Sequence, residues 1–162
     1  MNFSPSSRVW IYLSSREFAA SEVSELNELI KKFCVQWAAH GKNLHANGEV
    51  LHQRFIMLMV DETRAGASGC SIDTSVHFIQ RIEREYNTQL FNRTLIAFKK
   101  GEQVRVINAS EAKEMLKEER INEQTPVFNT LVQTKDEFDH KFVIPLRESW
   151  LVRFLQPANN HH

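Results

Sequence analysis

The residues with the clearest chemical potential lie in and beside one short stretch, AGASGCSID, at positions 65–73. Cys70 supplies a thiol, which becomes a nucleophile once it has lost its proton. Asp73 follows it and Asp61 precedes it, and either carboxylate could assist by taking up that proton. Cys70, Asp73 and Asp61 are therefore the candidate catalytic residues.

The same stretch has the composition of a turn that binds an anion. Its two glycines leave the backbone free to direct N–H groups at a ligand. Apolar residues at helical spacing begin near Thr74, so Ser71 or Asp73 is the expected N-cap. Cys70 is then expected just outside the helix N-terminus, where the helix dipole favours negative charge, including that of a thiolate. The candidate ligand-binding residues are Ser68, Gly69, Ser71 and His40.

Two hypotheses about function follow. In the first, the protein is a binding or regulatory module, and the turn at 65–73 holds a small anionic ligand or a protein partner. In the second, it is a small cysteine-dependent enzyme in which Cys70 is the nucleophile and Asp61, Asp73 or His40 assists. The first is preferred because the sequence shows no complete catalytic set. A purely structural role is the third option, with Cys70 as a small filler and Asp73 as a helix cap.

No metal or cofactor is expected. His40, His45 and His52 are separated by five and seven residues, which is not a recognised zinc spacing. The sequence lacks G-x-x-x-x-G-K-[ST] and G-x-G-x-x-G, the glycine-rich signatures of nucleotide phosphate binding. It also lacks the G-x-S-x-G signature of a hydrolase nucleophile.

The elements before the candidate turn must position it. Residues 8–13 are β-branched and aromatic, which predicts a strand. A helix should follow, capped by Ser21 and stopped by Gly41 in the left-handed conformation. Asn47-Gly48 predicts a type I′ hairpin turn. The apolar run at 55–60 then predicts a central strand, buried on both faces, that delivers Asp61 and Glu62 at its carboxyl end.

Further elements are expected beyond the candidate turn. A helix is predicted from Thr74 to Tyr86, and Gly101-Glu102 predicts a type II′ hairpin. Four further features complete the prediction: a helix capped by Asn108, a capping box with Glu111, an extended segment at 127–132, and a final helix that starts at Pro145.

This order of elements predicts an α+β fold, with a mixed, mainly antiparallel sheet and helices packed on its faces. We expect residues 1–156 to form a single globular domain. Residues 157–162, the sequence PANNHH, are expected to be a disordered tail.

The composition argues against nucleic acid and membranes as binding partners. The 162 residues include 20 Lys and Arg and 20 Asp and Glu, so the formal net charge is zero. A chain with no net positive charge lacks the excess of basic residues expected of a protein that binds nucleic acid or an anionic membrane. The first apolar run, which starts at Val9, is too short for a secretory signal or a membrane span. The two cysteines do not suggest a disulfide framework, so a reducing, cytoplasmic location is expected.

Four segments together resemble a family of small uncharacterised bacterial proteins: FCVQWAAHGKNL, RFIMLMVDE, SGCSIDTSVHFI and PLRESWLVRFL. The resemblance spans residues 8–155 and implies no established activity. Members are sometimes labelled ABC transporter ATPase, but such an ATPase needs a P-loop and this sequence has none. The resemblance agrees that residues 61–73 are the distinctive part of the chain.

Overall fold

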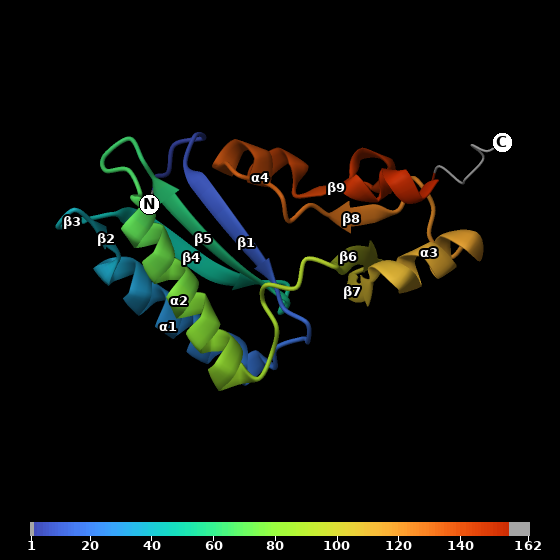
Figure 1. The fold of residues 1–162 in the computed structure, drawn as a ribbon, viewed down its shortest axis with the longest axis horizontal. Coiled ribbons are helices and arrows are strands. Elements are labelled where there is room, and N and C mark those ends of the chain that lie inside the picture. The colour runs from blue at the N-terminus through green and yellow to red at the C-terminus, as the bar shows by residue number, and fades with distance from the viewer. Residues whose placement is uncertain (1, 156–162) are drawn as a thin grey trace. The chain divides into compact units, whose positions relative to one another are not determined.

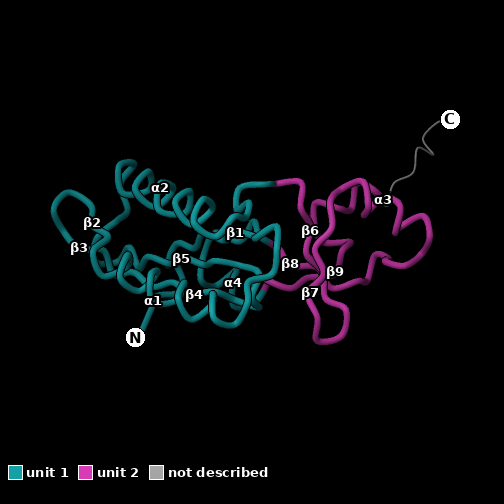
Figure 2. Tube along the Cα trace, turned by 90° about the horizontal axis from the view of Figure 1, so that it is seen from below, with its two compact units in different colours: residues 1–92, 130–140 teal, residues 93–129, 141–162 magenta. Residues whose placement is uncertain are grey.

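The computed structural model describes residues 2–155, and the chain divides into two compact units. Unit 1 comprises Met1–Asn92 and Thr130–His140, and unit 2 comprises Arg93–Asn129 and Lys141–His162 (Figure 2). The expectation of a single domain over residues 1–156 stays a prediction. The predicted tail at 157–162 lies outside the described residues.

Unit 1 is built on a three-stranded antiparallel sheet in the order β1-β5-β4 (Figure 1). Its strands are β1 (Arg8–Leu13), β4 (His45–Leu51) and β5 (Phe55–Asp61). β5 pairs with a neighbour on each side and all its residues are buried, which confirms the central strand predicted at 55–60. Since β1 and β4 are both antiparallel to β5, they run parallel to each other, as in a split β-α-β unit.

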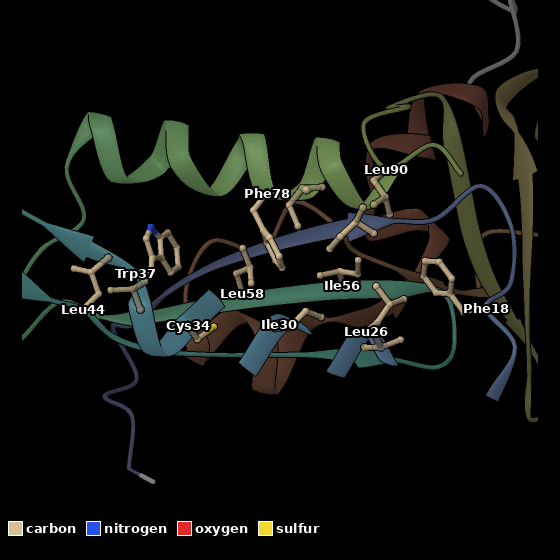
Figure 3. Packing of buried hydrophobic residues seen from close by; sticks show 14 of the residues in the cluster. Phe18, Leu26, Ile30, Cys34, Trp37, Leu44, Ile56, Leu58, Phe78 and Leu90 are labelled. Atoms are coloured by element: carbon tan, nitrogen blue, oxygen red, sulfur yellow. The ribbon is translucent and has the colours of Figure 1, made fainter. Parts of the chain in front are cut away.

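Two helices, α1 (Ala20–Gln36) and α2 (Gly69–Tyr86), cover one face of this sheet. Side chains from both helices meet alternate residues of β5 in one apolar cluster, because every second residue of a strand faces the same side. Figure 3 shows this cluster between α2 and the sheet. Its fully buried members include Leu26, Ile30, Ile56, Leu58, Ile79 and Ile82.

The predicted hairpin turn at Asn47-Gly48 is wrong, because both residues lie inside β4. The turn between β4 and β5 is instead formed by His52 and Gln53, whose φ angles are 52° and 57°. Two positive φ angles are those of a type I′ turn, here without glycine. The Gln53 side chain donates to the Phe18 carbonyl at 2.9 Å, and the Gln53 carbonyl accepts from the Phe18 N–H at 2.8 Å. Tertiary hydrogen bonds therefore hold a turn that local propensity does not favour.

The first helix also ends earlier than predicted. α1 stops at Gln36, and a short hairpin of β2 (Ala38–Ala39) and β3 (Lys42–Asn43) follows. His40 and Gly41, with φ angles of 51° and 78°, form its turn. The left-handed conformation of Gly41 is thus used in a hairpin rather than as a helix stop. At the other end, Ala19 rather than Ser21 is the N-cap residue.

The segment at 130–140 returns to unit 1 and lies along the free edge of β1. The Val9 N–H donates to the Gln133 carbonyl at 3.0 Å, and the Lys135 N–H donates to the Ser7 carbonyl at 2.8 Å. The short helix α4 (Lys135–Lys141) begins there. The sequence patterns did not predict this helix, which has no buried residue and hence no apolar stripe.

Unit 2 contains a second antiparallel sheet in the order β7-β6-β8-β9. Its elements are β6 (Leu95–Lys100), β7 (Gln103–Asn108), α3 (Ala109–Lys117), β8 (Pro126–Phe128) and β9 (Val143–Pro145). The predicted two-residue turn at Gly101-Glu102 is confirmed, and Gly101 has a positive φ of 64°. The helix capped by Asn108 is also confirmed, with the Asn108 side chain accepting from the Glu111 N–H at 2.8 Å.

The final predicted helix is wrong. Pro145 closes β9, and two 3₁₀ helices follow, at Leu146–Glu148 and Trp150–Leu155. The Ser149 hydroxyl donates to the Leu146 carbonyl at 2.6 Å, which is a local bond that competes with a continuous α-helix. With the observed helices and antiparallel pairs, the predicted α+β class is confirmed.

Candidate functional site

The candidate turn leads into α2, whose N-cap is Ser68. The Ser68 hydroxyl accepts from the Ser71 N–H at 3.1 Å, and the Ser71 hydroxyl accepts from the Ser68 N–H at 2.7 Å. This reciprocal pair is a capping box in which serine takes the place usually held by Glu or Gln. The predicted caps, Ser71 and Asp73, are therefore wrong, and Cys70 lies inside the first turn rather than before the helix.

Ser71 fixes this turn to the core of unit 1. Its side chain is buried, and its carbonyl accepts from the Trp37 indole Nε1–H at 2.8 Å. Trp37 itself is only 2% exposed. Its ring contacts the rings of Trp10 and Phe33. This hydrogen bond is buried and therefore shielded from water, and it holds the start of α2 in place.

Asp61 is buried at the end of β5 and is hydrogen-bonded through both carboxylate oxygens. Oδ1 accepts from the Thr63 hydroxyl at 2.6 Å and from the Thr63 N–H at 3.0 Å, while Oδ2 accepts from the Ser4 N–H at 3.1 Å. These bonds, the Thr63 hydroxyl foremost, lower the pKa of Asp61 to about 2. Its carboxylate organises the start of the loop and the N-terminal segment.

Glu62, which the sequence placed with Asp61 at the end of the central strand but not among the candidate site residues, also contacts the loop. Its Oε2 accepts from the Ala67 N–H at 2.8 Å, which folds the loop back on the end of β5. Arg8 lies 3.9 Å from Oε1, and its guanidinium is over the Trp10 ring. A glutamate that bonds a backbone N–H five residues later has no sequence signature of its own.

The remaining candidates are exposed. Cys70 and Asp73 both lie on the solvent side of α2, and His40 lies in the β2–β3 turn. Within residues 2–155, no hydrogen bond or ion pair joins the Cys70 thiol to Asp61, Asp73 or His40. Cys34 is buried in the core, where burial raises the pKa of its thiol to about 12.

Two backbone N–H groups at the start of α2 remain open. The amides of Ala67, Ser68, Ser71 and Ile72 are bonded within the loop and its cap. In the described part of the chain, the N–H groups of Gly69 and Cys70 have no such partner. The first turn contains no Asp or Glu to offset the helix dipole. Apart from its chain neighbours and the backbone of its own helix, no atom lies within 4 Å of the position that a Cβ on Gly69 would occupy.

Among residues 2–155, no group of three His, Cys, Asp or Glu side chains is placed to hold a metal ion. No helix in the same range has the length and apolar character needed to cross a membrane. Comparison with known proteins gave no match to a family model, to a curated protein or to a solved structure. The resemblance drawn from the four sequence segments therefore stays a prediction.

Proposed function

We propose that the protein is a binding module that holds a small oxyanion, such as phosphate or a carboxylate, at the N-terminus of α2. The observation that carries this proposal is the pair of open amides at Gly69 and Cys70, on an 18-residue helix with no acidic residue in its first turn. Unpaired N–H groups and the positive end of the helix dipole together favour an anion.

The surroundings support a preformed site. The Ser68–Ser71 capping box, the Trp37 bond to the Ser71 carbonyl and the Glu62 bond to the Ala67 amide fix the backbone before a ligand arrives. A preformed backbone reduces the entropy lost on binding. A small anion is favoured over a large one because the cationic contribution comes from one helix end and not from a basic patch.

The test compares two substitutions at one position. Gly69→Asp places a carboxylate at the helix start, where it should compete with a bound anion and stabilise the unliganded helix by about 0.3–1 kcal/mol. Gly69→Asn has nearly the same size without the charge. Thermal unfolding is measured for both variants and the parent with increasing sodium phosphate, against sodium chloride at equal ionic strength.

Phosphate at ten times its dissociation constant should stabilise the parent and Gly69→Asn by about 1.4 kcal/mol. Gly69→Asp should show no phosphate-specific stabilisation. Equal responses of all three proteins would contradict an anion site at the start of α2.

The second candidate function is cysteine-dependent catalysis, and the exposure of Cys70 in the same turn favours it. A nucleophile there would lie next to an anionic group held by the open amides. A suitable base must then come from the substrate or from solvent, because the Asp61 oxygens are bonded to Ser4 and Thr63. A covalent adduct on Cys70, formed with an anionic electrophile and prevented by Gly69→Asp, would support this alternative.

A further inference from the structure

The outer strands of the three-stranded sheet in unit 1 and of the four-stranded sheet in unit 2 differ in how their edges are protected. An unpaired edge strand is a template for another strand, and proteins usually block it. The β1 edge bonds to the segment at 130–140 through Val9 and Gln133. The β4 edge is met by α1, since the Val50 N–H donates to the Asn27 side chain at 2.9 Å. β9 has only three residues and ends in Pro145, which has no N–H.

β7 lacks each of these protections. It is an edge strand of six residues, Gln103–Asn108, without proline, glycine or a bulge. The two-residue turn at 101–102 makes Lys100 and Gln103 a hydrogen-bonded pair, so alternate residues of β7 bond to β6. The N–H and C=O groups of Val104 and Val106 consequently point away from the sheet. In the described residues these groups have no hydrogen-bond partner.

Cationic side chains flank this open edge. Arg105 lies on β7 between the two valines, and Lys99 and Lys100 lie on the neighbouring strand β6. None of the three makes an ion pair within residues 2–155. The Arg105 guanidinium lies over the ring of Phe98 on β6, 5.9 Å from the ring centroid. The hairpin carries one acidic residue, Glu102, against these three cations.

We propose that β7 accepts an extended, acidic segment of a partner protein as an added strand. Main-chain bonds to Val104 and Val106 supply the pairing, and the three cations select acidic side chains on the incoming strand. A second copy of the chain fits less well. In the antiparallel register that pairs Val104 with Val106, Arg105 lies opposite Arg105, and like charges directly opposite are destabilising. This surface is separate from the proposed anion site.

The experiment uses the full chain and two capped peptides, acetyl-EVEVEV-amide and acetyl-KVKVKV-amide. Binding is measured by ¹⁵N NMR together with amide hydrogen exchange. Saturation with the glutamate peptide should slow exchange at Val104 and Val106 and leave the already paired Arg105 amide unchanged. The lysine peptide should bind at least about tenfold more weakly, which corresponds to about 1.4 kcal/mol.

Two variants distinguish the contribution of main-chain hydrogen bonds from the contribution of charge to peptide binding. Val106→Pro removes one outward N–H without removing a bond of the β6–β7 ladder, and it should abolish binding of the glutamate peptide. Arg105→Glu keeps the edge but leaves two cations against two carboxylates on the hairpin, so it should remove the preference between the two peptides. This variant lets the proposal be judged even if the proline variant fails to fold.

Absence of protection at Val104 and Val106 with saturating glutamate peptide would overturn the proposal. Equal affinity for the two peptides would overturn its charge selectivity. Concentration-dependent dimerisation by sedimentation, lost in Val106→Pro, would show that a second copy occupies the edge instead.

Discussion

At the scale of single residues, the two cysteines show how environment sets reactivity. Cys34 is buried in the helical core, with a pKa raised to about 12, whereas Cys70 is exposed in the first turn of α2. Since the thiolate is the reactive species, Cys70 should be alkylated well before Cys34. Iodoacetamide treatment of the folded protein at neutral pH, followed by mass spectrometry of its peptides, measures both rates.

Cys70→Ser is the matched control for this prediction and should leave a protein that resists alkylation until it unfolds. Equal inertness of the two thiols in the folded parent would contradict a reactive Cys70. It would then be a small residue at a helix start and nothing more.

Asp61 makes a prediction about pH. Its hydrogen bonds lower the pKa from 3.8 to about 2, so folding favours the charged form. The stabilisation is complete above a pH of about 4 and is lost as the pH falls through the folded pKa. Urea unfolding midpoints of Asp61→Asn should therefore change less between pH 4 and 2 than those of the parent.

Glu22 provides the control for that measurement. The Arg16 guanidinium lowers the pKa of Glu22 to about 2, so its contribution is lost in the same pH range. Glu22→Gln should independently reduce the change of the urea unfolding midpoint between pH 4 and 2. The two effects should add, because no contact connects the two carboxylates. Parallel curves for the parent and Asp61→Asn would show that the bonds to Ser4 and Thr63 do not hold in solution.

The sequence patterns located the candidate turn but misplaced its cap. Both Ser68 and Ser71 have a hydroxyl suited to capping, and the apolar stripe that begins near Thr74 favoured the later one. The structure uses the earlier one, because Ser71 is buried and its carbonyl bonds to Trp37. A contact between residues 34 positions apart is invisible to a local pattern.

At the scale of elements, Gly48 explains how α1 approaches β4. A Cβ at this position would lie 2.7 Å from the Met57 carbonyl oxygen and 2.8 Å from Ile30 Cγ2. The sequence pattern assigned this glycine to a turn, because Asn-Gly is a strong local signal. Close helix–strand packing also requires glycine, and only the tertiary structure separates the two uses.

Gly48→Ala should therefore destabilise the protein by roughly 1–3 kcal/mol through overpacking. Gly69→Ala is the matched control, since nothing lies within 4 Å of its new Cβ, and its effect should stay within about 0.5 kcal/mol. Denaturant unfolding of the two variants checks the difference. An equal, small effect of both would mean that α1 does not approach β4 as closely as the structure shows.

At the scale of the whole molecule, unit 1 is assembled from two separate stretches of the chain. Residues 130–140 close the β1 edge through backbone bonds to Ser7 and Val9. Strand and helix periodicity predicted the α+β class and the central β5, since these depend on local spacing. The return of a distant segment depends on which edge remains open, which local spacing does not encode.

This arrangement predicts cooperative opening. If residues 130–140 belong to unit 1, the Lys135 and Val9 amides should exchange hydrogen with similar free energies of opening, close to that of the β1–β5 ladder. Native-state hydrogen exchange followed by NMR measures the free energy of opening at both amides. Exchange at Lys135 with little protection, while Val9 is strongly protected, would assign the segment to a separately opening part of the chain.

A ¹⁵N NMR titration with sodium phosphate at constant ionic strength tests whether the start of α2 binds an anion. The Gly69 and Cys70 amide resonances should move most and saturate with one dissociation constant, because their N–H groups are open at the helix end. The Gly41 and Gly101 resonances should stay in place, and Gly69→Asp should remove the effect. Shifts confined to lysine-rich surfaces, with the Gly69 and Cys70 resonances unmoved, would show that the start of α2 is not an anion site.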